Sequence, residues 1–141
     1  MAKRKQTKLT GPAAEFVRWA RVSRVATVSG EGVPHLVPVC HALLGRKVYV
    51  GSGNDALKIR NLQANPRITL TVDEYSDQWS SLKGVMVQGR ARLIARGPEF
   101  TRVREALYDK YPQYSKEAAL APSDSVIIEI TPSRVFTWGL K

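Results

Sequence analysis

Hydrophobic and polar residues alternate in several short stretches of the chain, which is the pattern of half-buried β-strands. These stretches cover residues 22–29, 33–42, 47–52, 67–74 and 85–95. Two further stretches, 125–130 and 134–138, flank Thr131-Pro132-Ser133, and we expect them to form a terminal hairpin. The pattern therefore predicts about seven strands.

Three other stretches place apolar residues at helical spacing, and they cover residues 12–22, 55–64 and 97–112. Pro12 and Pro98 suit the first position of the outer two helices, where the missing amide hydrogen of proline costs nothing. We expect Asn54 or Asp55 to cap the middle helix with its side chain.

Neighbouring strands are joined by short turns, so the sheet should be antiparallel. Many short strands usually close into a barrel or pack as a sandwich, which removes exposed edges. We expect a mainly β fold, a barrel of about six to seven strands with flanking helices, as one domain over residues 11–141. Pro34 and Pro38 each remove a backbone donor, so their strand should lie at an edge, carry a bulge or face something other than a strand.

Charge narrows the range of ligands. The chain of 141 residues has 22 Lys and Arg against 12 Asp and Glu, a net charge of +10. Residues 1–10 are rich in these cations, and we expect them to form a basic, flexible tail. Such a protein attracts nucleic acid, acidic lipid or phosphorylated small molecules. Nucleic acid is the weakest of these choices, because aromatic residues are not interleaved with the basic ones.

Several other classes of protein fit poorly. No apolar stretch approaches the ~20 residues that span a membrane, and the first residues do not resemble a secretory signal. A single cysteine, Cys40, cannot form an internal disulfide, which suits a cytoplasmic protein. His35, Cys40 and His41 do not match a metal motif, and no nucleophile with a base stands out. We expect neither a metal nor a catalytic side chain.

The clearest candidate for chemistry is the segment GSGNDALKIRNL, residues 51–62. The first turn of a helix has unpaired backbone donors and a partial positive charge. Gly51 and Gly53 allow close approach to the backbone, and Lys58 adds a full charge one turn inside the helix. The segment is either a phosphate site or an ordinary solvated helix with surface cations.

The neighbouring motifs carry a family resemblance over most of the chain. They are ATVSGEGVPHLVPV, KVYVGS, RNLQANPRITLTV, the YSDQWS loop and the terminal TWGL. Together they resemble the pyridoxamine 5'-phosphate oxidase-like FMN-binding split-barrel superfamily, and above all its small members described as F420-dependent enzymes. The specific part is Lys58 in a helix after the third strand, followed by the proline of NPR, Pro66.

The resemblance implies roles for residues at the corner after the third strand. Lys58 would contact the phosphate of FMN or F420, together with Ser52 and the backbone near Gly51. Arg60 would add positive charge there, although two helical steps turn it away from Lys58.

It also implies how the ring of the cofactor is held. Val37, Pro38 and Val39 match the strand that lies along the ring, which offers a second reason for the prolines. Trp79 and Trp138 would cover the ring or shape a substrate pocket. For Trp138, packing in the core or against a second subunit is an equal alternative.

The resemblance finally implies an activity: hydride transfer between FMN or F420 and a small unsaturated or carbonyl-type substrate, in a homodimer with the cofactor in the groove between subunits. Oxidation of vitamin B6 fits poorly, because the enzymes that perform it have an arginine where Val37 stands and a cation where Leu57 stands. The alternative is a protein that binds or stores FMN, F420 or haem without turnover.

Overall fold

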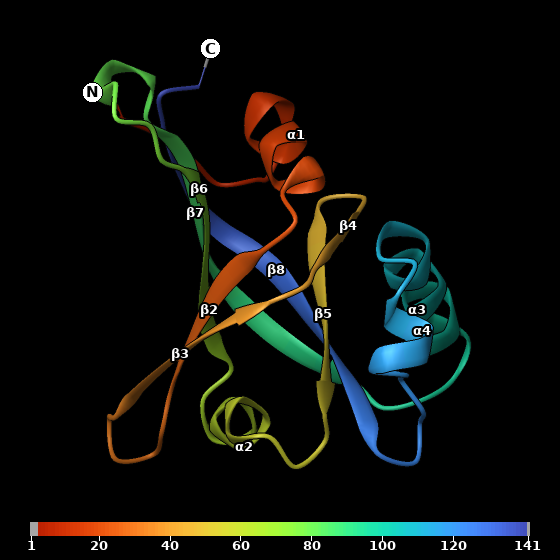
Figure 1. The fold of residues 1–141 in the computed structure, drawn as a ribbon. Helices are drawn as coiled ribbons and strands as arrows, with labels where there is room; N and C mark the ends of the chain where they lie inside the picture. Colours follow the sequence, from red (N-terminus) through yellow and green to blue (C-terminus); the bar gives the residue numbers. More distant parts are fainter. Residues whose placement is uncertain (1–2, 141) are drawn as a thin grey trace.

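The computed structural model describes residues 3–140 and shows an antiparallel half-barrel, the split-barrel fold, with helices around it (Figure 1). The mainly β fold class expected from the sequence is confirmed, with eight strands in the sheet. The elements are β1 (Lys3–Gln6), α1 (Gly11–Trp19), β2 (Ser23–Val28), β3 (Pro34–Val39), β4 (Ala42–Leu44), β5 (Lys47–Gly53), α2 (Leu57–Ala64), β6 (Arg67–Glu74), the 3₁₀ turn η1 (Trp79–Ser81), β7 (Lys83–Ile94), α3 (Pro98–Lys110), α4 (Tyr114–Glu117) and β8 (Ser125–Trp138).

The strands follow the order β3-β2-β6-β7-β8-β5-β4, and β1 pairs with β8 beside this path. Strands β3 and β4 are consecutive in the chain yet lie at opposite ends of the path, joined only by Cys40 and His41. Pro34 and Pro38 belong to β3, which pairs with β2 alone. Of the three arrangements that the prolines allowed, the structure shows the edge position.

The terminal hairpin expected around Thr131-Pro132-Ser133 is wrong, because β8 is one strand of 14 residues. It pairs with β7 along both halves, with β5 in its first half and with β1 in its second. The turn-like residues instead form a β-bulge opposite Gln88 and Gly89 of β7. Proline and serine are tolerated there because a bulge interrupts the ladder of hydrogen bonds.

Strand β1 corrects part of the flexible tail expected over residues 1–10. Lys3–Gln6 pairs with β8, and Leu9 is buried in the core with 1% of its surface exposed. The pairing satisfies backbone groups on that side of β8, so these basic residues have a structural role. Residues 1 and 2 lie outside the described residues.

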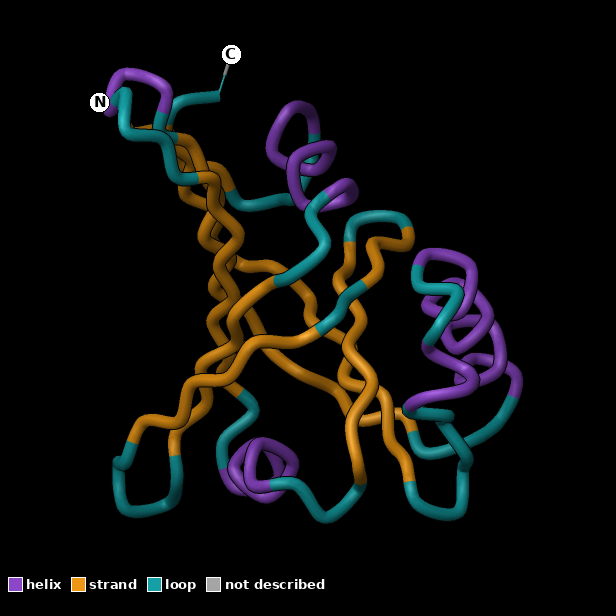
Figure 2. Tube along the Cα trace, in the orientation of Figure 1, coloured by secondary structure: helices purple, strands orange, loops and turns teal. Residues whose placement is uncertain are grey.

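Two apolar clusters hold the fold together. The larger one fills the half-barrel and includes Val17 from α1 and Ile59 from α2. The smaller one packs α3 against the outer face of β5 and β8, through Phe100, Leu107 and Ile127. Figure 2 shows α3 and α4 on that side and α2 below the sheet. The first half of β8 is therefore buried on both faces, which explains the consecutive apolar residues at 126–128.

The helices begin and end at different residues from those predicted. Helix α1 stops at Trp19, and α2 starts at Leu57 with Ala56 as its N-cap, so neither Asn54 nor Asp55 caps it. Asp55 and Asn54 lie one and two residues before the N-cap, in the turn that precedes the helix. No helix in the described part of the chain is long and apolar enough to cross a membrane.

Candidate functional site

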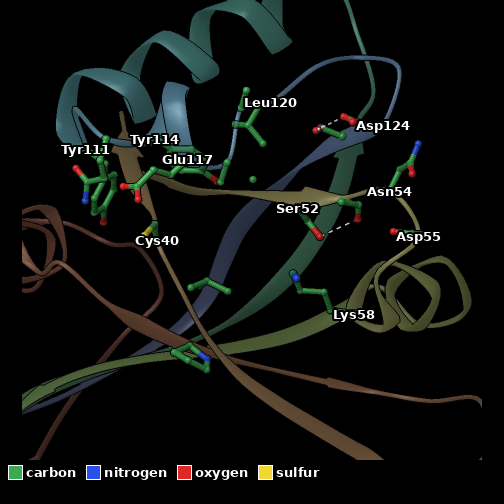
Figure 3. A pocket seen from close by; sticks show the side chains of 18 residues that line it. Cys40, Ser52, Asn54, Asp55, Lys58, Tyr111, Tyr114, Glu117, Leu120 and Asp124 are labelled. Carbon is green, nitrogen blue, oxygen red and sulfur yellow. Dashed lines mark hydrogen bonds between the residues drawn. The ribbon is translucent and has the colours of Figure 1, made fainter.

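A cavity of about 780 Å³ opens where β5 turns into α2, with α4 above it (Figure 3). We call it the Lys58 cavity. It is lined by Pro38, Val39, Cys40, Gly51, Ser52, Gly53, Asn54, Asp55, Lys58, Tyr111, Gln113, Tyr114, Glu117, Ala118, Ala119, Leu120, Asp124 and Ser125. The volume is within the range of ligand sites that hold a small organic molecule.

The end of β5 forms one wall of the cavity. A Cβ atom at Gly51 would lie 2.7 Å from the Tyr114 hydroxyl and 2.9 Å from the methyl groups of Leu120. Glycine therefore allows these two side chains to pack directly against the backbone of β5. The next residue, Ser52, donates a hydrogen bond from its hydroxyl to the Gly53 carbonyl, 2.9 Å away. Lys58 extends from α2 toward Ser52, as Figure 3 shows.

Lys58 is the only cation that lines this cavity among residues 3–140. Its side chain is half-buried, and burial lowers the pKa of its amino group. Within the described residues no carboxylate pairs with it, although Asp55, Glu117 and Asp124 line the same cavity. A partly desolvated ammonium without a counter-ion favours binding of an anion beside it.

Tyrosines form the opposite wall, next to Cys40 (Figure 3). The rings of Tyr111 and Tyr114 lie 6.3 Å apart, and Tyr108, which does not line the cavity, packs against Tyr114 with the ring centres 5.8 Å apart. Burial raises the pKa of Tyr114 to about 12, so its hydroxyl keeps its proton at neutral pH. This wall therefore combines aromatic surface with a hydrogen-bond donor.

A buried network fixes the position of this wall. The Tyr111 hydroxyl lies 2.9 and 3.1 Å from the carbonyl oxygens of Arg21 and His41, and its single proton is donated to these two acceptors. The Lys110 amino group lies 2.9 Å from the same His41 carbonyl, and burial lowers its pKa to about 8. His41 Nε2 lies 2.7 Å from the Val17 carbonyl and so carries the proton. These contacts tie α1, α3 and the β3–β4 connection together.

Five of the nine predicted cofactor residues meet at the Lys58 cavity: Pro38, Val39, Gly51, Ser52 and Lys58. They come from three elements, β3, β5 and α2.

The other four predicted residues do not line the cavity. Val37 packs against the core inside the half-barrel, on the same face of β3 as Val39 but two residues further from the end of the strand. Arg60 is exposed on another side of α2. Trp79 is 72% exposed and lines a separate hollow near Leu140. Trp138 is half-buried and packs over Gly84 of β7.

The wall formed by Tyr111 and Tyr114 was not predicted from the sequence. Tyr111 and Tyr114 follow α3, about fifty residues along the chain from Lys58. Nothing in their spacing marks them as site residues, because only the packing of α3 on the sheet brings them over β5. Among residues 3–140, no three His, Cys, Asp or Glu side chains gather closely enough to hold a metal ion.

Comparison with known proteins agrees with this architecture. A solved structure called F420 Reductase superposes with a TM-score of 0.68 at 22% identity, over 89% of this chain and 96% of that one. HutZ, the haem storage protein of Vibrio cholerae, superposes with a TM-score of 0.75 at 18% identity, over 89% of this chain and 91% of that one. At these identities the likeness concerns the fold alone.

Sequence comparison identifies the family. The 5a,11a-dehydrotetracycline/5a,11a-dehydrooxytetracycline reductase of Streptomyces rimosus subsp. rimosus is 25% identical over 131 residues, which is 89% of this chain and 80% of the reductase. The family model described as pyridoxamine 5'-phosphate oxidase matches residues 9–139. The chain therefore belongs to the pyridoxamine 5'-phosphate oxidase family of split barrels.

Proposed function

We propose that this protein is an oxidoreductase that uses FMN or F420 and acts on a small unsaturated or carbonyl-type substrate. One observation carries the proposal: Lys58 enters a cavity of about 780 Å³ half-buried and without a counter-ion among the described residues. An anionic cofactor supplies the missing negative charge.

The residues present fit the phosphate of such a cofactor. Lys58 offers a charged donor, the Ser52 hydroxyl lies next to it, and Gly51 is among the residues that line the same cavity. The first turn of α2 also directs amide hydrogens toward this corner. Three carboxylates line the cavity as well. We therefore expect a long acidic tail, such as that of F420, to leave the cavity.

When bound, FMN or F420 supplies the hydride chemistry, so the protein needs no nucleophile. The chain's own residues position the reactants. Pro38 and Val39 give a flat apolar surface, and the Tyr114 hydroxyl can donate a hydrogen bond to a substrate oxygen. The buried contacts of Tyr111 keep that wall rigid, which preserves the alignment on which hydride transfer depends.

The relatives support reduction more than oxidation of vitamin B6. One relative is named a reductase and one structural neighbour an F420 reductase. Val37 and Leu57 also stand where the B6-oxidising enzymes have cations, as the sequence analysis noted.

A second candidate is binding or storage without turnover, because a haem storage protein shares the fold. Histidine is not among the described residues that line the Lys58 cavity, and His41 is fully buried with its Nε2 bonded to Val17. Haem would therefore need a ligand other than histidine from this wall. Stoichiometric cofactor binding with no steady-state reduction of any acceptor would favour this candidate.

We further propose a homodimer with the cofactor between subunits. Strand β3 ends the sheet and exposes Leu36 by 65%, beside Val33 at 60%. An apolar sheet edge of this kind is usually covered. Light scattering of the purified protein tests the assembly, and a monomeric mass at all concentrations would contradict it.

The cofactor test compares equilibrium binding of FMN and F420 by fluorescence titration. For the native cofactor, Lys58→Ala should weaken binding at least tenfold, about 1.4 kcal/mol. Lys116→Ala removes an exposed charge from α4 and serves as the matched control. Failure of both cofactors to bind the unaltered protein, or equal losses in the two variants, would refute the proposal.

A further inference from the structure

A second cationic feature lies on the outer face of the sheet and shares no residue with the Lys58 cavity. It is a groove of about 450 Å³ across β2, β6, β7 and β8. Its lining consists of Ala26, Val28, Arg67, Ile68, Thr69, Gln88, Gly89, Arg90, Ser133 and Arg134. We call it the arginine groove, because three guanidinium groups and no carboxylate are among the described residues that line it.

The strand register brings these arginines together. Arg67 of β6 lies directly opposite Arg90 of β7. Two residues further along the strands, and so on the same face, Gln88 of β7 lies between Thr69 of β6 and Arg134 of β8. Residues directly opposite one another share a face of the sheet, so three adjacent strands present their cations on one surface.

The bulge in β8 is what turns Arg134 onto this surface. Before it, the even-numbered residues Val126, Ile128 and Ile130 point into the core. After it, Val135 points into the core, so the alternation has shifted by one residue. Without the shift, Arg134 would face the interior.

Two residues hold the bulge in place. Ser133 is the extra residue, and its hydroxyl donates to the Gln88 carbonyl at 3.1 Å. Gly89 is required opposite, because a side chain there would overlap the Thr131 carbonyl oxygen. Bulges of this kind often redirect a side chain toward a functional site.

The charges in this groove are uncompensated. Arg92, which lies on β7 as Arg90 does, pairs with Glu129 at 3.0 Å and also with Glu99. By contrast, no carboxylate within residues 3–140 pairs with Arg67, Arg90 or Arg134. Like charges directly opposite each other destabilise a sheet. A bound anion would remove this repulsion.

We propose that the arginine groove binds the phosphate groups of a small polyphosphorylated molecule. Guanidinium groups suit phosphate because each offers two parallel donors. The Thr69 hydroxyl and the Gln88 amide lie between the arginines as neutral donors. The groove has no aromatic residue in its described lining, so it lacks the stacking surface that single-stranded nucleic acid uses.

The test is calorimetric titration of the full chain with sodium tripolyphosphate. Arg90→Gln should weaken binding at least tenfold, while Arg96→Gln, which removes an equally exposed charge outside the groove, should change it less than twofold. Arg134→Gln should behave like Arg90→Gln. Thermal unfolding of each variant verifies that the fold is intact.

Three outcomes of the tripolyphosphate titrations would overturn the proposal. They are no binding by the unaltered protein, equal losses in Arg90→Gln and Arg96→Gln, and loss of binding in Lys58→Ala with retention in Arg90→Gln. An Arg90-dependent affinity for single-stranded DNA without affinity for tripolyphosphate would also overturn it, in favour of nucleic acid. Arg90→Gln leaves the Lys58 cavity untouched, so cofactor binding by this variant tests the proposed function separately from the arginine groove.

Discussion

The Lys58 cavity and the arginine groove attract anions in opposite ways. The cavity has one half-buried cation in a space of about 780 Å³, with tyrosines and Pro38 around it. The groove has three exposed cations on a sheet face, with a lining that contains no aromatic ring among the described residues. Burial makes a single charge effective by limiting solvent screening, whereas exposed charges have to act in number. The cavity is therefore suited to one specific molecule and the groove to charge density.

The largest effect should come from a substitution that affects the groove and spares the cavity. Gly89→Ala places a methyl group against the Thr131 backbone, which cannot move without disrupting the bulge. We expect a loss of about 3 kcal/mol in the free energy of unfolding. Gly30→Ala, where a Cβ meets nothing within 4 Å, is the control. Urea unfolding measures both, and similar midpoints for the two variants would contradict the bulge argument.

A pH change should affect the cavity side and spare the groove. Burial lowers the pKa of His41 from 6.5 to about 4, so the folded protein holds it neutral while the unfolded chain takes up a proton. Its contribution to stability is present above about pH 6.5 and is lost as the pH falls toward about 4. Between about pH 7.5 and about pH 5 this amounts to roughly 2 kcal/mol.

Urea unfolding at the two pH values measures this loss. His41→Gln should abolish it, and His35→Gln should leave it in place. An NMR titration in which the His41 ring of the folded protein gains its proton near the ordinary value would rule out the explanation, whatever the stability of the variants.

The two sites should also separate when their ligands are measured in both variants. Lys58→Ala should weaken cofactor binding at least tenfold, about 1.4 kcal/mol, and leave tripolyphosphate binding within twofold. Arg90→Gln should do the reverse. Fluorescence and calorimetric titrations give the four affinities, and a variant that weakens both ligands alike would show that the two regions are not independent.

Salt should produce the smallest difference. Raising NaCl from about 50 to about 200 mM screens exposed charges, so we expect tripolyphosphate affinity to fall about fivefold and cofactor affinity less than about twofold. The same titrations, repeated at the two salt concentrations, measure this. An equal dependence on salt would show that burial of Lys58 does not distinguish the sites.

The sequence predicted the elements of the fold better than their connections. Alternation located β2, β3, β5, β6 and β7, and Pro34 and Pro38 located the sheet edge. The prediction of strands from the sequence failed at Thr131-Pro132-Ser133, because a bulge inside a strand and a turn between two strands use the same residues. It also failed at β1, since charge alone does not reveal that the backbone of Lys3–Gln6 completes the pairing of β8.

Part of the candidate site could be predicted from the sequence, and another part could not. Gly51 and Lys58 form a local motif that the sequence offered as one of two interpretations, and the family resemblance added Ser52 to it. The wall made by Tyr111 and Tyr114 could not be predicted, because it depends on how α3 packs against β5 and β8. The same holds for the arginine groove, whose members meet only through cross-strand register and the shifted alternation after Ser133.

Strand β8 comes last of all the strands along the chain and yet pairs with β7, β5 and β1. While the protein is being synthesised, the edges of those three strands that face β8 stay unpaired until β8 leaves the ribosome. Long-range pairing of this kind slows folding and prolongs the exposure of strand edges. A nascent chain stalled before Ser125 should therefore be unable to close its sheet and should be prone to aggregate or to recruit chaperones.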